Sequence, residues 1–212
     1  MKNILSTLIS ILVLSNIAYA QDEADAREKL AIGFKAGVNY SNVYDSKTED
    51  FNANPKAGFA GGGFISIPIS KYLGIQPEVL YSQRGFTGTG TYLGTTYNLK
   101  RTLNYLDIPL LFAFKPTPGL TILAGPQYSF LLSQQDVFSN SLLTYNQEQD
   151  FKNDNIRKNT FCVTGGLDFN VNNLVLSVRT GWDMTSNHGD GTSSTPRYKN
   201  VWLQGTVGFR LY

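Results

Sequence analysis

The feature that most constrains this chain is an alternation of apolar and polar side chains that recurs in eight segments from residue 32 onward. In the first segment, residues 32–41, the even positions hold Ile, Phe, Ala, Val and Tyr, and the odd positions hold Gly, Lys, Gly, Asn and Ser. Successive side chains of a β-strand point to opposite faces, so each segment predicts a strand with one apolar face. The other segments are 56–69, 73–84, 102–115, 120–133, 160–171, 174–185 and 201–211.

The lengths of these segments and of their connections favour a membrane over a soluble sheet. The segments span 10 to 14 residues, whereas strands of soluble domains have about 5–6 and a tilted strand that crosses a bilayer needs about 9–11. Because the strands are antiparallel, alternating long and short connections place all long loops at one end, as in outer-membrane barrels. The long connections are 42–55, 85–101, 134–159 and 186–199, and the short ones are 70–72, 116–119 and 172–173.

Charged residues on the polar face bear on which side of the sheet faces lipid. In lipid an open sheet edge is too costly, so the sheet must close and turn its polar face inward. An eight-stranded barrel is only wide enough for side chains to fill, and buried charges must pair. We therefore expect an ion-paired plug, with Asp107 at a height between Glu78 and Arg84 on the neighbouring strand, and Asp168 diagonal to Arg179. The predicted inward charges are Lys35, Lys56, Glu78, Arg84, Asp107, Lys115, Asp168, Arg179, Asp183 and Arg210.

The predicted fold is all-β, an eight-stranded antiparallel up-and-down transmembrane β-barrel. A few apolar residues fall on the polar face, and we expect them to fill the narrow interior: Leu80, Tyr105, Leu111, Leu123 and Trp202. Aromatic residues of the apolar face gather toward the two strand ends, as in interfacial belts. A soluble sandwich or barrel, with the apolar face turned inward, is the alternative.

The chain divides into three predicted parts: a signal peptide at 1–20, a periplasmic leader at 21–31 and the outer-membrane barrel domain at 32–212. Lys2, the apolar run 4–14 and the Ala-Tyr-Ala sequence at 18–20 have the order of a cleavable export signal. Cleavage would leave Gln21 as the first residue. An uncleaved anchor helix is the alternative, and residues 22–31 are compatible with a short helix or a frayed leader.

The composition and the motifs of the chain give little indication of a catalytic or ligand-binding site. Lys+Arg 18 against Asp+Glu 16 gives a net charge of +2, which argues against an electrostatic nucleic-acid binder. His188 is the single histidine, and a Gly-rich surface turn explains it more simply than a catalytic base does. The acidic residues Asp45, Glu49 and Asp50 match no calcium loop, and Cys162 predicts a buried free thiol. We expect no enzyme activity, no catalytic residues, no cofactor and no metal.

A Gly-rich stretch at 88–94 (GTGTYLG) superficially resembles a phosphate-binding loop. Its glycine spacing is not that of a nucleotide loop, and no β-α unit surrounds it. We expect the tip of a long hairpin instead.

Several segments resemble the PorT-like outer-membrane β-barrel proteins. These are 34–41 (FKAGVNYS), 75–85 (IQPEVLYSQRG), 105–111 (YLDIPLL), 125–128 (GPQY) and 207–210 (VGFR). The resemblance implies an outer-membrane barrel and no single function; the protease-export role of a namesake does not carry over. Family members usually end on an aromatic residue in phase with the apolar face. Here Leu211 holds that phase and Tyr212 follows it, which implies that the assembly machinery reads a shifted register.

The sequence thus predicts a cell outer-membrane protein with a filled interior and a structural or interaction role through its long extracellular loops. The longest, 134–159, carries both charges and aromatic residues, and binding often lies in such loops. The expected partners are outer-membrane lipid, the barrel assembly machinery during insertion, and an extracellular or periplasmic protein. Two alternatives stay open: a secreted lipocalin-like carrier of an apolar ligand, and a lipid-modifying outer-membrane enzyme that uses His188.

Overall fold

The computed structural model describes residues 25–44, 52–92, 95–140, 144–149, 157–186 and 198–211. These ranges contain a short 3-10 helix, η1 (Ala26–Glu28), and the strands β1 (Ala31–Tyr44), β2 (Asn52–Pro68), β3 (Leu73–Tyr92), β4 (Thr95–Thr117), β5 (Leu120–Asn140), β6 (Thr144–Gln149), β7 (Asn159–Val171), β8 (Leu174–Asp183) and β9 (Lys199–Leu211). In this part of the chain, no helix has the length and apolar character needed to cross a membrane.

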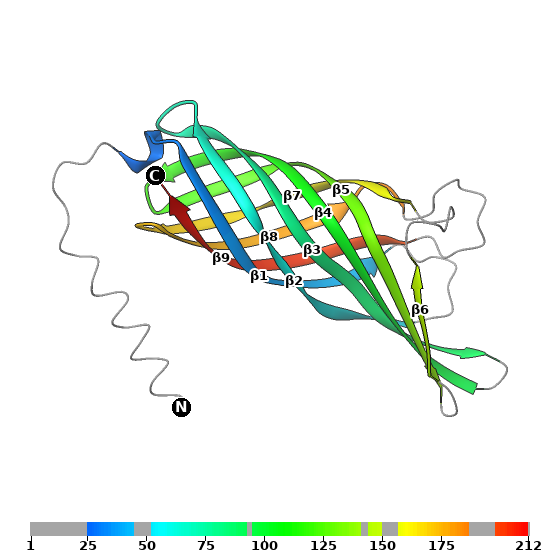
Figure 1. Cartoon of the computed structure of the whole chain (residues 1–212). Helices are drawn as coiled ribbons and strands as arrows, with labels where there is room; N and C mark the ends of the chain where they lie inside the picture. The colour runs from blue at the N-terminus through cyan, green and yellow to red at the C-terminus, as the bar shows by residue number, and fades with distance from the viewer. Residues whose placement is uncertain are drawn as a thin grey trace, which may run out of the picture.

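Eight of these strands close into an antiparallel barrel. The order around the ring is β4-β3-β2-β1-β9-β8-β7-β5, and β4 pairs with β5 to close it. The first and last strands join along Ile32↔Leu211 to Tyr44↔Lys199. β6 lies outside the ring and pairs with the outer end of β5. Figure 1 shows the ring of tilted strands and the short β6 beside it, which confirms the predicted fold class.

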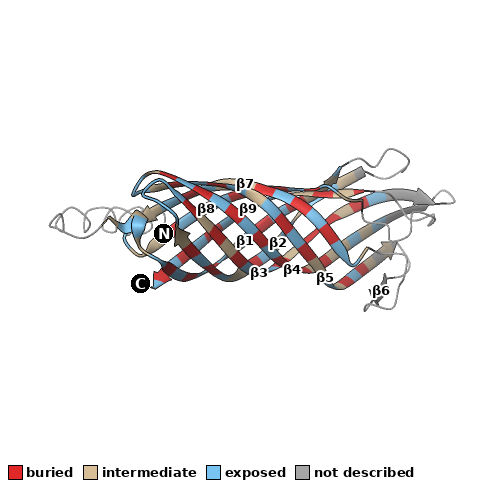
Figure 2. Ribbon diagram, turned by 90° about the horizontal axis from the view of Figure 1, so that it is seen from above, coloured by how far each residue is buried: buried red, intermediate tan, exposed pale blue. Residues whose placement is uncertain are grey.

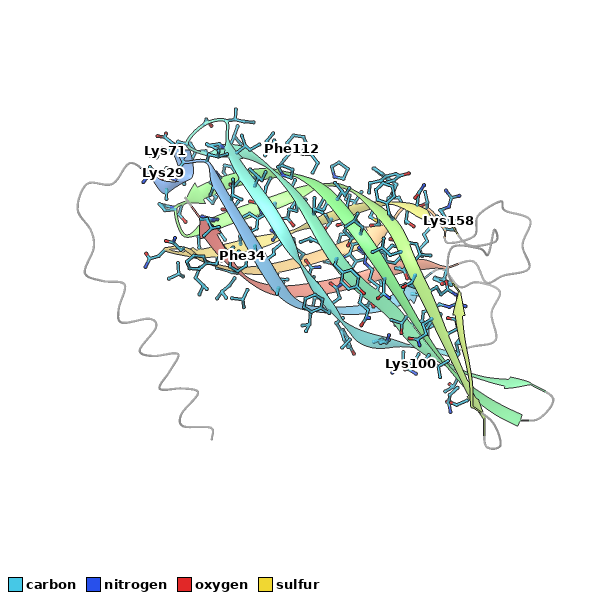
Figure 3. All side chains as sticks on the ribbon, in the orientation of Figure 1. Lys29, Phe34, Lys71, Lys100, Phe112 and Lys158 are labelled. Carbon is cyan, nitrogen blue, oxygen red and sulfur yellow. The ribbon has the colours of Figure 1, made fainter. Side chains whose placement is uncertain are left out.

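The apolar face of the sheet points outward. In β1, Phe34 is 58% exposed, whereas its neighbour Lys35 is 3% exposed. Figure 2 shows the same alternation of buried and exposed positions along the strands, and in Figure 3 the labelled Phe34 and Phe112 lie on the outside of the wall. The orientation is the one expected of a barrel in lipid, and it contradicts the soluble alternative with an apolar interior.

The outer ends of three strands extend further than the alternation predicts. β3 continues to Tyr92 and β4 begins at Thr95, so most of the predicted loop 85–101 is a paired ribbon. The stretch 88–92 belongs to this ribbon, as expected of a hairpin. β5 likewise runs to Asn140, and β6 pairs back onto it. The loop assignment was wrong here because the backbone pairing of the strands continues where the alternation of apolar and polar side chains stops.

A bulge between β2 and β3 explains two glycines of the wall. The register shifts between Pro55 and Ala60, and side chains from β1 bind the β3 backbone there. Asn39 Nδ2 donates to the Gln83 carbonyl at 3.1 Å, and the Gly85 amide donates to Ser41 Oγ at 2.8 Å. A Cβ at Gly58 would lie 2.3 Å from that Gln83 oxygen, and Gly85 has a φ of +151°. Both positions therefore require glycine.

Candidate functional site

The barrel interior holds a first ion-pair network drawn from four strands. Lys35 Nζ of β1 lies 2.5 Å from Glu78 Oε2 of β3. Arg179 of β8 lies 3.8 Å from the other Glu78 oxygen and 2.7 Å from Asp168 Oδ1 of β7. All four side chains are 2–3% exposed. The predicted diagonal contact of Asp168 with Arg179 is confirmed, and Glu78 is held by two cations.

A second network surrounds Arg84. Its guanidinium pairs with Asp107 and lies 3.8 Å from Asp183. Ser129 Oγ donates to Asp107 at 2.6 Å, and Asn200 Nδ2 donates to Asp183 at 2.6 Å. Each carboxylate thus also accepts a hydrogen bond from an uncharged neighbour, which a buried ion pair needs.

Cys162 belongs to the same cluster. It is a free, fully buried cysteine, and its Sγ donates to Asp183 Oδ1 at 3.1 Å. The prediction of a buried free thiol is confirmed.

Apolar and aromatic side chains fill the space between these networks. The five predicted interior residues are all buried: Leu80, Tyr105, Leu111, Leu123 and Trp202. Leu103, Tyr105 and Leu131 form one cluster, and Leu111, Ala113 and Leu123 form another. Nine of the ten predicted inward charges are buried, and Lys56 is half-buried. The described interior is therefore a packed core of side chains.

A third cluster lies at the long-loop end, beyond the apolar band of the wall. A row of polar groups on the outer surface ends that band, with Gln83 bound to Asn104 at 3.0 Å and Asn104 to Ser133 at 2.8 Å. Past this row, Arg101 makes two 2.7 Å hydrogen bonds to Asp136 and one of 3.0 Å to Tyr198 Oη.

The ring of Phe86 completes this cluster. It packs edge-on against Tyr198, with centroids 5.3 Å apart. Burial opposes the charge of Arg101, but Tyr198 and Asp136 more than offset it and raise the pKa of the guanidinium. Sequence reasoning missed these four residues because they fall in predicted loops, where spacing carries no contact information.

At the other end, η1 docks on the short turn between β4 and β5. Asp25 accepts hydrogen bonds from Arg27 Nε at 2.9 Å and from Arg27 Nη2 at 2.6 Å. Arg27 Nη1 reaches the Pro116 carbonyl at 3.2 Å, and Lys115 Nζ donates to the Arg27 carbonyl at 3.0 Å. The hydrogen bonds from Arg27 hold the pKa of Asp25 well below its ordinary value. Residues 25–28 thus contact the barrel mouth.

Several candidate positions lie outside the described residues. These are His188, the acidic residues Asp45, Glu49 and Asp50, and the predicted export segment 1–20. Within the described ranges, no cluster of three or more His, Cys, Asp or Glu side chains has a geometry that could hold a metal ion.

A comparison with known families gives the context for this geometry. Residues 19–188 match the family described as outer membrane protein beta-barrel domain. The chain belongs to this family. As a member of it, this barrel lies in the outer membrane, and its apolar outer wall faces the lipid.

Several solved structures are similar to this chain at low sequence identity. The attachment invasion locus protein Ail of Yersinia pestis shares 14% identity over 85% of this chain and 98% of its own, with a TM-score of 0.45. Neisserial surface protein A shares 12% over 87% and 100%, with a TM-score of 0.47. OprG of Pseudomonas aeruginosa shares 12% over 90% and 100%, with a TM-score of 0.46. No curated protein matches the sequence.

Proposed function

We propose that this protein is a closed membrane anchor whose outer sheet binds a protein partner outside the cell. The observation that carries the proposal is the contrast between the interior and the long-loop end. Inside, charges pair with one another and rings fill the remaining space. Outside, the ends of β3, β4 and β5 continue past the apolar band and form a sheet with β6 (Figure 1). Binding on a rigid scaffold of this kind fits an interaction role.

The edge of β6 that faces away from β5 is the favoured contact surface. β6 pairs with β5 from Gln134↔Gln149 to Ser139↔Thr144. Among the described strands, none pairs with its other edge. Unpaired backbone groups on an edge strand accept an added strand from another chain. An extended peptide segment of a partner protein is therefore the expected ligand.

Site-specific photo-crosslinking in intact cells tests this function. A photoreactive amino acid at Gln147 of β6 should give a discrete adduct with one extracellular protein. The same group at Leu203, which faces lipid and is 52% exposed, is the matched control and should give none. The captured protein must then bind the purified barrel and lose that binding when residues 144–149 are deleted. Equal labelling from both positions would contradict the proposal.

The two alternative functions receive less support. A lipocalin-like carrier needs an apolar cavity, whereas the described interior carries paired charges and the apolar face points outward. A lipid-modifying enzyme would depend on His188, so His188→Ala should change the lipid profile of the cell. We expect no change, because the proposed role is non-enzymatic.

Within the family, we infer a PorT-like subgroup from the segments 34–41, 75–85 and 105–111. We also infer a Gram-negative cell, insertion by the barrel assembly machinery, and export by a signal peptide at 1–20 that leaves the periplasmic leader 21–31 on the mature chain. N-terminal sequencing of the protein purified from outer membranes should begin at Gln21. A chain that begins at Met1 would show that the segment stays attached.

A further inference from the structure

A polar pocket lies at the end of the barrel that holds the short turns. Its enclosed part has about 10 Å³, room for one water-sized group, and the pocket is partly open to the outside. Four cationic residues, Arg27, Lys29, Lys115 and Arg210, are among the described residues that line it, and none of the described lining residues is acidic. Figure 3 shows the labelled Lys29 at this end. This is a different location from the extracellular sheet.

Two of the cations reach the pocket from opposite walls. Lys115 is on β4 and Arg210 is on β9, and these strands are separated by three strands in either direction around the ring. Both side chains are nonetheless buried, with residue exposures of 5% and 8%. Two like charges are therefore held in one enclosure, which is unfavourable unless an anion lies between them.

The two cations have hydrogen-bond donors in excess of their partners. Arg210 Nη2 donates to Asn170 Oδ1, while Arg210 Nε is buried and has no hydrogen-bond partner among the described residues. Lys115 Nζ donates to the Arg27 carbonyl, and an ammonium group has two further donors. A group rich in acceptors would satisfy these donors.

Two described carboxylates at this end of the barrel, Asp25 and Asp168, are already paired with cations other than Lys115 and Arg210. Asp25 pairs with Arg27 and lies 3.4 Å from Lys71. Asp168, two residues deeper along β7 than Asn170, pairs with Arg179. The wall of the pocket is also fixed, because Asn170 Nδ2 donates to Thr121 Oγ1 at 3.1 Å and the Asn170 amide donates to the Gly119 carbonyl at 2.8 Å.

We propose that this periplasmic pocket binds a phosphate group between Lys115 and Arg210. An oxyanion oxygen fits the enclosed volume, and the remaining oxygens lie in the open mouth, where Arg27 and Lys29 are within the lining. Two sources carry this group at the periplasmic face of the membrane: free inorganic phosphate and the headgroup of a phospholipid in the inner leaflet.

Calorimetric titration of the full barrel protein in a nonionic detergent, with sodium phosphate against sodium chloride at equal ionic strength, tests the site. We expect saturable binding of phosphate alone. Lys115→Gln and Arg210→Gln should each weaken it about tenfold or more, because each removes charge-assisted hydrogen bonds. Lys100→Gln, at an exposed lysine of the opposite end, is the matched control and should bind as the wild type does.

A second kind of variant tests the site without removing either cationic side chain. Thr121→Glu places a carboxylate in the same wall while both cations remain, so it should abolish phosphate binding and leave the barrel folded. The same titration in nanodiscs of phosphatidylethanolamine and phosphatidylglycerol identifies the source of the phosphate group. If phosphate binds more weakly in nanodiscs than in detergent, a lipid headgroup competes for the pocket. If phosphate binds equally in both, the ligand is the free anion. Absence of saturable binding, or equal binding by the Lys115, Arg210 and Lys100 variants, overturns the proposal.

Discussion

The guanidinium of Arg84 stacks on the indole of Trp202, with Cζ 3.5 Å from the ring centroid. Arg84 is on β3 and Trp202 is on β9, and the ring of Tyr105 covers the same guanidinium with its centroid 4.9 Å away. A planar cation between aromatic faces gains cation–π attraction as well as packing. The stack is thus part of the plug that fills the barrel.

Asp107 should be the most sensitive partner of this stack. Asp107→Ala leaves Arg84 with Asp183 at 3.8 Å as its remaining carboxylate, and removal of one partner from a buried pair costs about 3–5 kcal/mol. Urea unfolding in detergent micelles, followed by heat-modifiable gel mobility, measures the loss. The double variant Arg84→Met with Asp107→Ala should recover part of it, since no uncompensated charge remains. A loss under about 1 kcal/mol in the single variant would argue against a stabilising pair.

The same plug predicts a low conductance. Because the interior is packed with side chains of both networks, the wild-type barrel in a planar bilayer should show no large single-channel steps. Replacement of both Arg84 and Trp202 by Ala removes this stack and should raise the conductance. A large conductance of the wild type would contradict a filled interior.

The outward face offers a direct test of orientation. Leu110 lies on the outside of β4 and is 47% exposed. Leu110→Arg should cost about 2–4 kcal/mol in a phospholipid bilayer, since the charge then faces hydrocarbon. Thr89→Arg, at an exposed position of the ribbon that β3 and β4 form beyond the apolar band, is the control and should cost under about 1 kcal/mol. Equal costs would mean that the apolar band does not contact lipid.

The docking of η1 should depend on pH through Asp25. Its folded pKa lies below the ordinary value of 3.8 because Arg27 and Lys71 stabilise the carboxylate. The stabilising contact is therefore complete above about pH 4 and is lost as the pH falls through the lower, folded pKa. A spin label on Ala26→Cys reports this, because the native Cys162 is buried. The label should be immobile from pH 7 to 5 and mobile in strong acid.

Asp25→Asn supplies the control for that titration. The variant removes the charge at every pH, so the label should be mobile already at pH 7. If the wild type and the variant gave the same spectra throughout, the pairing of Asp25 with Arg27 would not hold η1 in place.

The spacing of apolar residues along the sequence was enough to predict the strands that form the barrel wall and which face of each strand is apolar. The period of two placed Lys35, Glu78 and Arg179 on the inner face, and the two-residue turn at 172–173 fixed the register that sets Asp168 diagonal to Arg179. Such contacts follow from the chain itself because neighbouring strands are joined by short turns. Where no face is apolar, as in the ribbon to Tyr92, the same period disappears and the prediction failed.

The closure of the barrel determined contacts that the spacing of residues along the sequence could not predict. Lys35 meets Glu78 across an intervening strand, Arg84 meets Trp202 across two, and Lys115 and Arg210 line one pocket from opposite walls. Tyr198, next to β9, meets Arg101 of β4 in the same way. Alternation along a strand specifies which side chains point inward, because it depends only on backbone geometry. Which of them meet depends on the curvature and tilt of the closed wall, and those exist only in the assembled barrel.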